Sequence, residues 1–107
     1  MVVYEVTIVA AAGLSEDFET YMRGEHIRDV LATGYFTGAS FFCASESRYC
    51  TRYEARSEEE LDHYLEHQAP RLREDFLAHF PDGVEVSREV WKEIERFGPQ
   101  ADTEDAE

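Results

Sequence analysis

Lysine and long apolar runs are both scarce in this sequence. Lys92 is the only lysine, and ten basic residues stand against 24 acidic ones, for a formal net charge of -14. An acidic surface of this kind repels phosphate backbones and anionic lipid headgroups, so we expect no nucleic-acid partner and no membrane partner. No stretch approaches the roughly 18 apolar residues that cross a bilayer as a helix.

Cysteine is scarce as well, with only Cys43 and Cys50 in the chain. The N-terminal stretch MVVYEVTIVA has no basic region and carries Glu5 within its apolar run, unlike a secretion signal. We therefore expect a cytoplasmic protein with two free thiols, and a cross-strand redox pair is the alternative. The acidic, arginine-rich composition has two explanations, which are a high-salt cytoplasm and a GC-rich genome.

The residues that are abundant suffice for one compact domain. Apolar residues make up 43% of the 107-residue chain and aromatic residues 13%, which is enough for a single core. We predict one domain over residues 1–97. The last ten residues, GPQADTEDAE, are polar and acidic, so residues 98–107 are predicted to form a disordered tail.

Apolar periodicity predicts the order strand, helix, strand, strand, helix, strand. Residues 2–10 alternate in the way of a strand with one buried face. Residues 57–80 begin with a capping box and keep apolar residues at steps of three and four, which predicts one long helix kinked at Pro70. A strand is predicted to begin at Val84, and the structure of residues 88–97 stays open between strand and helix.

The first helix has an irregular apolar stripe. Ser15 is the expected N-cap, and the stripe that includes Met22 resumes only at Ile27, five residues later. Five residues rotate a helix by about 500°, which is about 140° out of phase. We therefore predict that the helix bends or restarts at Gly24 and that His26 lies at the joint.

Residues 35–44 and 48–56 predict an antiparallel hairpin. A loop centred between Glu46 and Ser47 places Cys43 opposite Cys50. The core face of this hairpin would hold Phe36, Phe42, Tyr49, Tyr53 and Ala55. The other face would hold Tyr35, Phe41, Cys43, Cys50, Arg52, Glu54 and Arg56.

These elements predict an α+β domain of ferredoxin-like βαββαβ order, with a four-stranded antiparallel sheet and helices on one side. The other sheet face is then open, and it would carry Tyr35, Phe41 and the cysteines among charged residues. Because such a surface is unfavourable in water, we expect two sheets to pair face to face in a homodimer, as a dimeric α/β barrel.

Four stretches also resemble a known family: HIRDVLATGYF, RYEARS, HYLEHQAPRLRE and HFPDGVEVSREV. Over residues 1–95 the chain is similar to a bacterial domain of unknown function, the family numbered 4286. The resemblance implies a ferredoxin-like subunit of a dimeric α/β barrel and no assigned activity. His26 and Asp29 match the family's pattern, whereas proline usually stands at Arg28, and histidine is common at Gln68 and Phe76. A site built from several histidines is therefore not expected.

His26 is the leading candidate for a functional residue. An imidazole titrates near neutral pH, so His26 could bind a ligand or act as a general acid or base. The alternative is that His26 and Asp29 only bind backbone groups that the helix break exposes. For Arg52, an intersubunit ion pair is the alternative to ligand binding. The candidate ligand-binding set is His26, Asp29, Tyr21, Tyr35, Phe41 and Arg52.

We expect no metal site and no cofactor. His63 and His67 stand four residues apart on the second helix, but two nitrogen ligands alone do not hold a metal, and both point away from the core. His79 lies at the end of that helix, where it can interact with the helix dipole. The chain has no glycine-rich phosphate loop.

Three functions fit these observations. The first, which we favour, is binding of a small apolar or aromatic molecule in a cavity between sheet and helices. The second is a cofactor-independent monooxygenase-like enzyme with His26 as base, by analogy with antibiotic-biosynthesis-type monooxygenases of the same barrel plan. The third is an interaction scaffold whose acidic tail reaches a basic partner. Whether the protein is an enzyme stays open at this point.

Overall fold

The computed structural model describes residues 1–45 and 47–99. Of the predicted acidic tail, residues 100–107 therefore lie outside the described residues. The elements in chain order are β1 (Val2–Ala10), α1 (Ser15–Tyr21), the π-helical turn η1 (Met22–His26), α2 (Ile27–Ala32), β2 (Phe36–Ser45), β3 (Arg48–Ala55), α3 (Glu58–His67), α4 (Ala69–His79) and β4 (Val84–Lys92).

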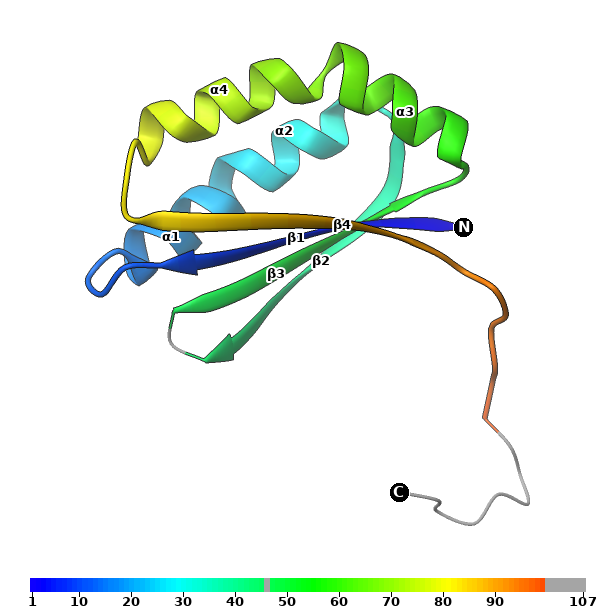
Figure 1. Ribbon diagram of the computed structural model, residues 1–107, viewed down its shortest axis with the longest axis horizontal. Coiled ribbons are helices and arrows are strands. Elements are labelled where there is room, and N and C mark those ends of the chain that lie inside the picture. Colours follow the sequence, from blue (N-terminus) through cyan, green and yellow to red (C-terminus); the bar gives the residue numbers. More distant parts are fainter. Residues whose placement is uncertain (46, 100–107) are drawn as a thin grey trace.

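The strands form one antiparallel sheet in the order β2-β3-β1-β4. The helices all lie against one face of this sheet, and the other face is uncovered (Figure 1). The predicted α+β ferredoxin-like fold of βαββαβ order is thus confirmed. Residues 88–92, whose structure the sequence left open, continue β4.

The core fills the space between the sheet and the helices as two clusters. One gathers around Tyr4, Tyr53 and Leu72, and the other around Phe18 and Phe76. Alternation along β1 sends every second side chain into this layer, so the same strand contributes to both clusters. A cavity lies where the two clusters meet.

A π-helical turn, and not a break, accommodates the five-residue step in the first helix. The Ile27 N–H group donates a hydrogen bond to the carbonyl of Met22, five residues earlier. This wider turn takes up one extra residue, so Met22 and Val30 are both buried, at 2% and 1% exposure. The predicted restart at Gly24 is therefore wrong, since α1, η1 and α2 form one continuous helix (Figure 1).

The β2–β3 register differs by one residue from the prediction. Cys43 lies opposite Tyr49, and Phe42 lies opposite Cys50. The register shifts near each end of β2 through irregularities of the β-bulge kind, which a count from the loop alone cannot detect. The predicted opposition of Cys43 and Cys50 is wrong, and both cysteines are free.

The corrected register exchanges residues between the two sheet faces. Phe41 lies on the helix-covered face, where its ring stacks on Tyr49 at a centroid distance of 5.6 Å. Phe42 instead is 50% exposed on the open face. Tyr35 precedes β2 and packs edge-on against Tyr64, on the helical side. Of the aromatic residues predicted for the open face, neither Tyr35 nor Phe41 lies there.

The second helical segment begins as predicted but is divided into two helices, where one long helix was predicted. The Ser57 hydroxyl accepts a hydrogen bond from the Glu60 backbone N–H at 3.2 Å, as expected of an N-cap. The Glu60 carboxylate pairs with Arg56 and does not return to Ser57. Gln68 separates α3 from α4, with Pro70 in the first turn of α4. Within the described part of the chain, none of the helices has the length and apolar character needed to cross a membrane.

Deletion of Gly24 should leave the fold intact. Met22 and Ile27 would then stand four residues apart, and a regular α-helix would keep both in the core. The deletion also removes a helix-interior glycine, which costs about 1 kcal/mol relative to alanine. We expect a melting temperature, followed by circular dichroism, that equals or exceeds that of the wild-type chain.

The matched control deletes Asp62 from α3, where the helix is regular. This deletion rotates Leu61 by about 100° relative to Tyr64. It should lower the free energy of unfolding by about 3 kcal/mol or more. If deletion of Gly24 destabilised the chain as much as deletion of Asp62, the extra residue would not be what the π-helical turn accommodates.

Candidate functional site

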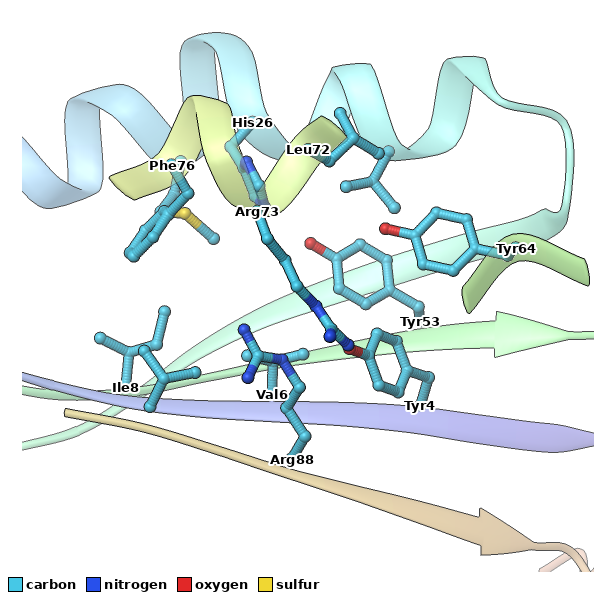
Figure 2. A pocket seen from close by; sticks show the side chains of 13 residues that line it. Tyr4, Val6, Ile8, His26, Tyr53, Tyr64, Leu72, Arg73, Phe76 and Arg88 are labelled. Carbon is cyan, nitrogen blue, oxygen red and sulfur yellow. The ribbon is translucent and has the colours of Figure 1, made fainter. Parts of the chain in front are cut away.

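A cavity opens between the sheet and the helices, where the two core clusters meet. It encloses about 40 Å³ and opens to solvent at its mouth. Its walls are mostly apolar and come from β1, β3, β4, η1, α2, α3 and α4. Val6 and Ile8 lie on the sheet side, and Leu72 and Phe76 lie on the helix side (Figure 2). A few polar groups interrupt these walls, namely one imidazole, three phenols and two guanidinium groups.

His26 is the last residue of η1 and reaches the cavity from the helical layer (Figure 2). Because α2 continues the same helix, His26 and Val30 lie one turn apart on the same side, and both line the cavity. The imidazole is half-buried and meets the Phe76 ring edge-on at a centroid distance of 5.5 Å. The π-helical turn thus sets the direction in which this side chain points.

The surroundings of His26 favour the neutral imidazole. Burial is the main cause that lowers its pKa below the ordinary value, and the positive charge of Arg88 acts in the same direction. Asp29 and Asp75 oppose this shift without reversing it. At neutral pH the ring is therefore uncharged and has one nitrogen free to accept a proton.

Three tyrosines form one end of the cavity. The rings of Tyr4 and Tyr53 are 6.1 Å apart, and those of Tyr4 and Tyr64 are 6.2 Å apart. Figure 2 shows the hydroxyl groups of Tyr53 and Tyr64 turned toward the interior of the cavity. Burial raises the pKa of both phenols well above the usual range, so they remain protonated and can donate hydrogen bonds to a ligand.

Two arginines stand at the mouth of the cavity. Arg73 extends from α4 across the opening and donates a hydrogen bond from Nη2 to the Tyr4 hydroxyl at 3.0 Å (Figure 2). Arg88 enters from β4 and lines the same cavity. The cavity therefore combines an apolar interior with a positively charged mouth.

The sequence grouped Tyr21 and Asp29 with His26 in one candidate site, but neither of them lines the cavity. Tyr21 is buried beneath the cavity wall, with its ring 5.8 Å from that of His26 and stacked on His79 at 4.0 Å. The Tyr21 ring packs near the His26 ring and is not part of the cavity wall. Asp29 is exposed on the outer side of α2 and acts on His26 only through its charge.

The other three candidates lie apart from the cavity. Tyr35 packs against Tyr64 from the far side. Phe41 belongs to the packing around Tyr49. Arg52 lies on the open sheet face, where it pairs with Glu5 at 3.4 Å. Of the six candidate residues, the structure brings only His26 into the cavity wall.

The sequence reading missed the tyrosines and arginines of the site, although two signals were present. Buried tyrosines need a partner for the hydroxyl group, which suggests a polar group nearby. In β4, Arg88 occupies the inward position between Val86 and Val90, where the pattern calls for an apolar side chain. A charged residue on a buried face is the kind of exception that marks a site.

Metal-ligating side chains do not gather here. Within residues 1–45 and 47–99, no group of three or more histidine, cysteine, aspartate or glutamate residues could hold a metal ion. His63 and His67 are exposed on α3.

Several solved structures share this fold. SnoaB from Streptomyces nogalater, a cofactor-independent oxygenase, has a TM-score of 0.69 at 9% identity over 92% of this chain and 98% of that chain. MhuD from Mycobacterium tuberculosis, a heme-degrader solved with two hemes in its active site, has a TM-score of 0.67 at 18% identity over 92% of this chain and 100% of that chain. An ethyl tert-butyl ether d (ethd) family protein from Bacillus halodurans has a TM-score of 0.66 at 11% identity over 88% and 100%.

At such low identity these likenesses establish the fold and nothing about the reaction. No curated protein matches the chain significantly in sequence. The family model described as a domain of unknown function does match, over residues 1–94. Because that match spans most of the chain, the protein belongs to the DUF4286 family.

Proposed function

We propose that this protein binds a small apolar or aromatic molecule in the cavity between its sheet and helices. The observation that carries this proposal is the lining of the cavity, where apolar side chains surround one imidazole and three phenol groups. The enclosed space, about 40 Å³, is smaller than the usual range of about 300–1,000 Å³ for small-molecule sites, so binding requires the lining side chains to move. Apolar walls with a few convergent polar groups are also typical of such sites. The apolar side chains would hold the body of the ligand, and His26 and the tyrosine hydroxyl groups would orient it.

Filling the cavity should abolish this binding. In the Val86→Trp variant an indole would occupy space between β4 and the helices, where Val86 is half-buried. We expect 2-naphthol, used as a planar aromatic probe, to bind the wild-type chain and to bind Val86→Trp at least tenfold more weakly. NMR shift changes of the cavity residues would report the affinity.

The matched control places the same indole outside the cavity. Leu77 is 54% exposed on α4 and does not line the cavity, so Leu77→Trp should bind 2-naphthol as the wild-type chain does. Equal binding by Val86→Trp and the wild-type chain would contradict the cavity as the binding site.

A cofactor-independent monooxygenase-like reaction is a second candidate function. The observation that favours it is a neutral, half-buried imidazole in the wall of an apolar cavity. His26 would take the proton of a phenolic substrate, and the electron-rich phenolate would react with dioxygen as co-substrate. The fold likeness to SnoaB, a cofactor-independent oxygenase, supports this candidate by analogy only.

The neutral imidazole should make the protein less stable in mild acid. The pKa of His26 is lowered in the folded chain, so the unfolded chain binds the proton first as the pH falls through about 6.5. The free energy of unfolding should then fall until the pH reaches the lowered pKa of the folded state. Urea denaturation at pH 7 and pH 5 should show a smaller loss for His26→Gln than for the wild-type chain.

The control for this experiment is His67→Gln. His67 is exposed on α3, so its removal should leave the wild-type pH dependence in place. If His26→Gln and the wild-type chain lost the same free energy between pH 7 and pH 5, His26 would not be held neutral by the fold.

We also propose that the chain forms a homodimer through its open sheet face. Phe42 and Trp91 are about half exposed on that face, at 50% and 48%. In the segment after β4, Ile94 and Phe97 are also exposed, at 98% and 75%. Burial of these side chains against a second sheet is the natural source of stability for a dimer.

Charges on the open face should disrupt this dimer. The double variant Phe42→Glu and Trp91→Glu would place four carboxylates in a two-fold interface, so we expect a monomer. Light scattering after size exclusion would measure the mass. Leu77→Glu is the control, since it adds a carboxylate on the helical side and should stay dimeric. A monomeric wild-type chain would contradict the proposal.

The scaffold hypothesis depends on the acidic tail, of which the structure describes only residues 98 and 99. No feature of the described chain favours it over the cavity.

A further inference from the structure

The positive charge at the cavity mouth is unusual for this chain. Acidic residues outnumber basic ones by 24 to 10, yet Arg73 and Arg88 both line the cavity. They come from α4 and β4, on opposite sides of the opening, and both side chains extend toward it (Figure 2). No side-chain carboxylate lines this cavity among the described residues.

Among the described residues neither arginine forms an ion pair, and the same holds for four arginines outside the cavity, Arg23, Arg28, Arg48 and Arg71. Arg52, Arg56, Lys92 and Arg96 each form an ion pair with a glutamate. Arg73 is held only by a neutral acceptor, the Tyr4 hydroxyl, at 3.0 Å. Arg88 has no hydrogen bond or ion pair to any residue in 1–45 and 47–99.

Two like charges that line the same cavity from α4 and β4 favour an anion placed between them. A charge near a low-dielectric surface interacts more strongly than one in water, so the mutual repulsion of the guanidinium groups is only partly screened. A planar guanidinium group binds a carboxylate through two parallel N–H donors. The arrangement therefore fits a ligand with an acidic end.

We propose that the ligand of this cavity is a small aromatic carboxylate, whose carboxylate is bound by Arg73 and Arg88 at the mouth while its ring occupies the apolar interior. This inference rests on the proposed binding function and specifies its ligand class. Arg73 can keep its bond to the Tyr4 hydroxyl, because a guanidinium group has five donors. Tyr4 thus acts as a positioning residue that holds Arg73 across the opening before the ligand arrives.

A matched pair of probes isolates the charge from the ring. 2-Naphthoate and 2-naphthamide share the same ring system, and only the first is an anion. Both would be titrated into the full chain at fixed ionic strength, because salt screens the interaction, with NMR shift changes at Val6 and Ile8 as the readout for the cavity. We expect the wild-type chain to bind 2-naphthoate roughly tenfold or more tightly than 2-naphthamide.

The variants assign that preference to the two arginines. The double variant Arg73→Gln and Arg88→Gln should lose roughly tenfold or more in affinity for 2-naphthoate while its affinity for 2-naphthamide stays unchanged. The control is the double variant Arg23→Gln and Arg71→Gln, which removes the same charge from exposed positions outside the cavity. It should bind both probes as the wild-type chain does. Circular dichroism would verify that each variant is folded.

The possible results separate this inference from the function on which it rests. Equal affinity of the wild-type chain for both probes, or an undiminished affinity of the arginine variant for 2-naphthoate, would overturn the carboxylate proposal and leave cavity binding standing. Shift changes confined to residues outside the cavity, or no binding of either probe, would overturn both. An equal loss of 2-naphthoate binding in the control variant would show that net charge, and not the two arginines, sets the preference.

Discussion

The phase of the first helix is the constraint on which the rest of the site depends. Apolar side chains five residues apart cannot face one core on a regular α-helix, because that spacing is about 140° out of phase. The hydrogen bond from the Ile27 N–H group to the Met22 carbonyl widens one turn and restores the alignment. The same π-helical turn ends at His26. It therefore keeps the apolar side chains of the helix in the core and also directs the imidazole into the cavity.

The polar side chains of the cavity come from different elements of the fold. His26 comes from the helical layer, Tyr4 from β1, Arg73 from α4 and Arg88 from β4. Burial keeps the imidazole neutral, and the guanidinium groups remain charged at the mouth. An apolar interior with a neutral base and a cationic entrance suits an aromatic ligand with one acidic end.

The sheet separates the cavity from the open face that we propose for dimerisation. Its inner face builds the cavity with the helices, and its outer face carries Phe42 and Trp91 toward solvent. Strand alternation makes these surfaces independent, since neighbouring residues on a strand point to opposite sides. A change at Phe42 can therefore alter assembly without touching a cavity residue such as Val6.

The sequence alone determined the element order, the open sheet face and the N-cap at Ser57. These follow from local periodicity, capping and chemistry, which act over a few residues. The one-residue register shift that moved Phe41 into the core came from bulges, which depend on contacts between strands.

Only the tertiary structure brought Arg73 and Arg88 together. They belong to different elements, and no local pattern of the sequence links the two positions. Their shared cavity depends on how α4 crosses the sheet above β4, which is decided by the packing of the entire core and not by any local pattern.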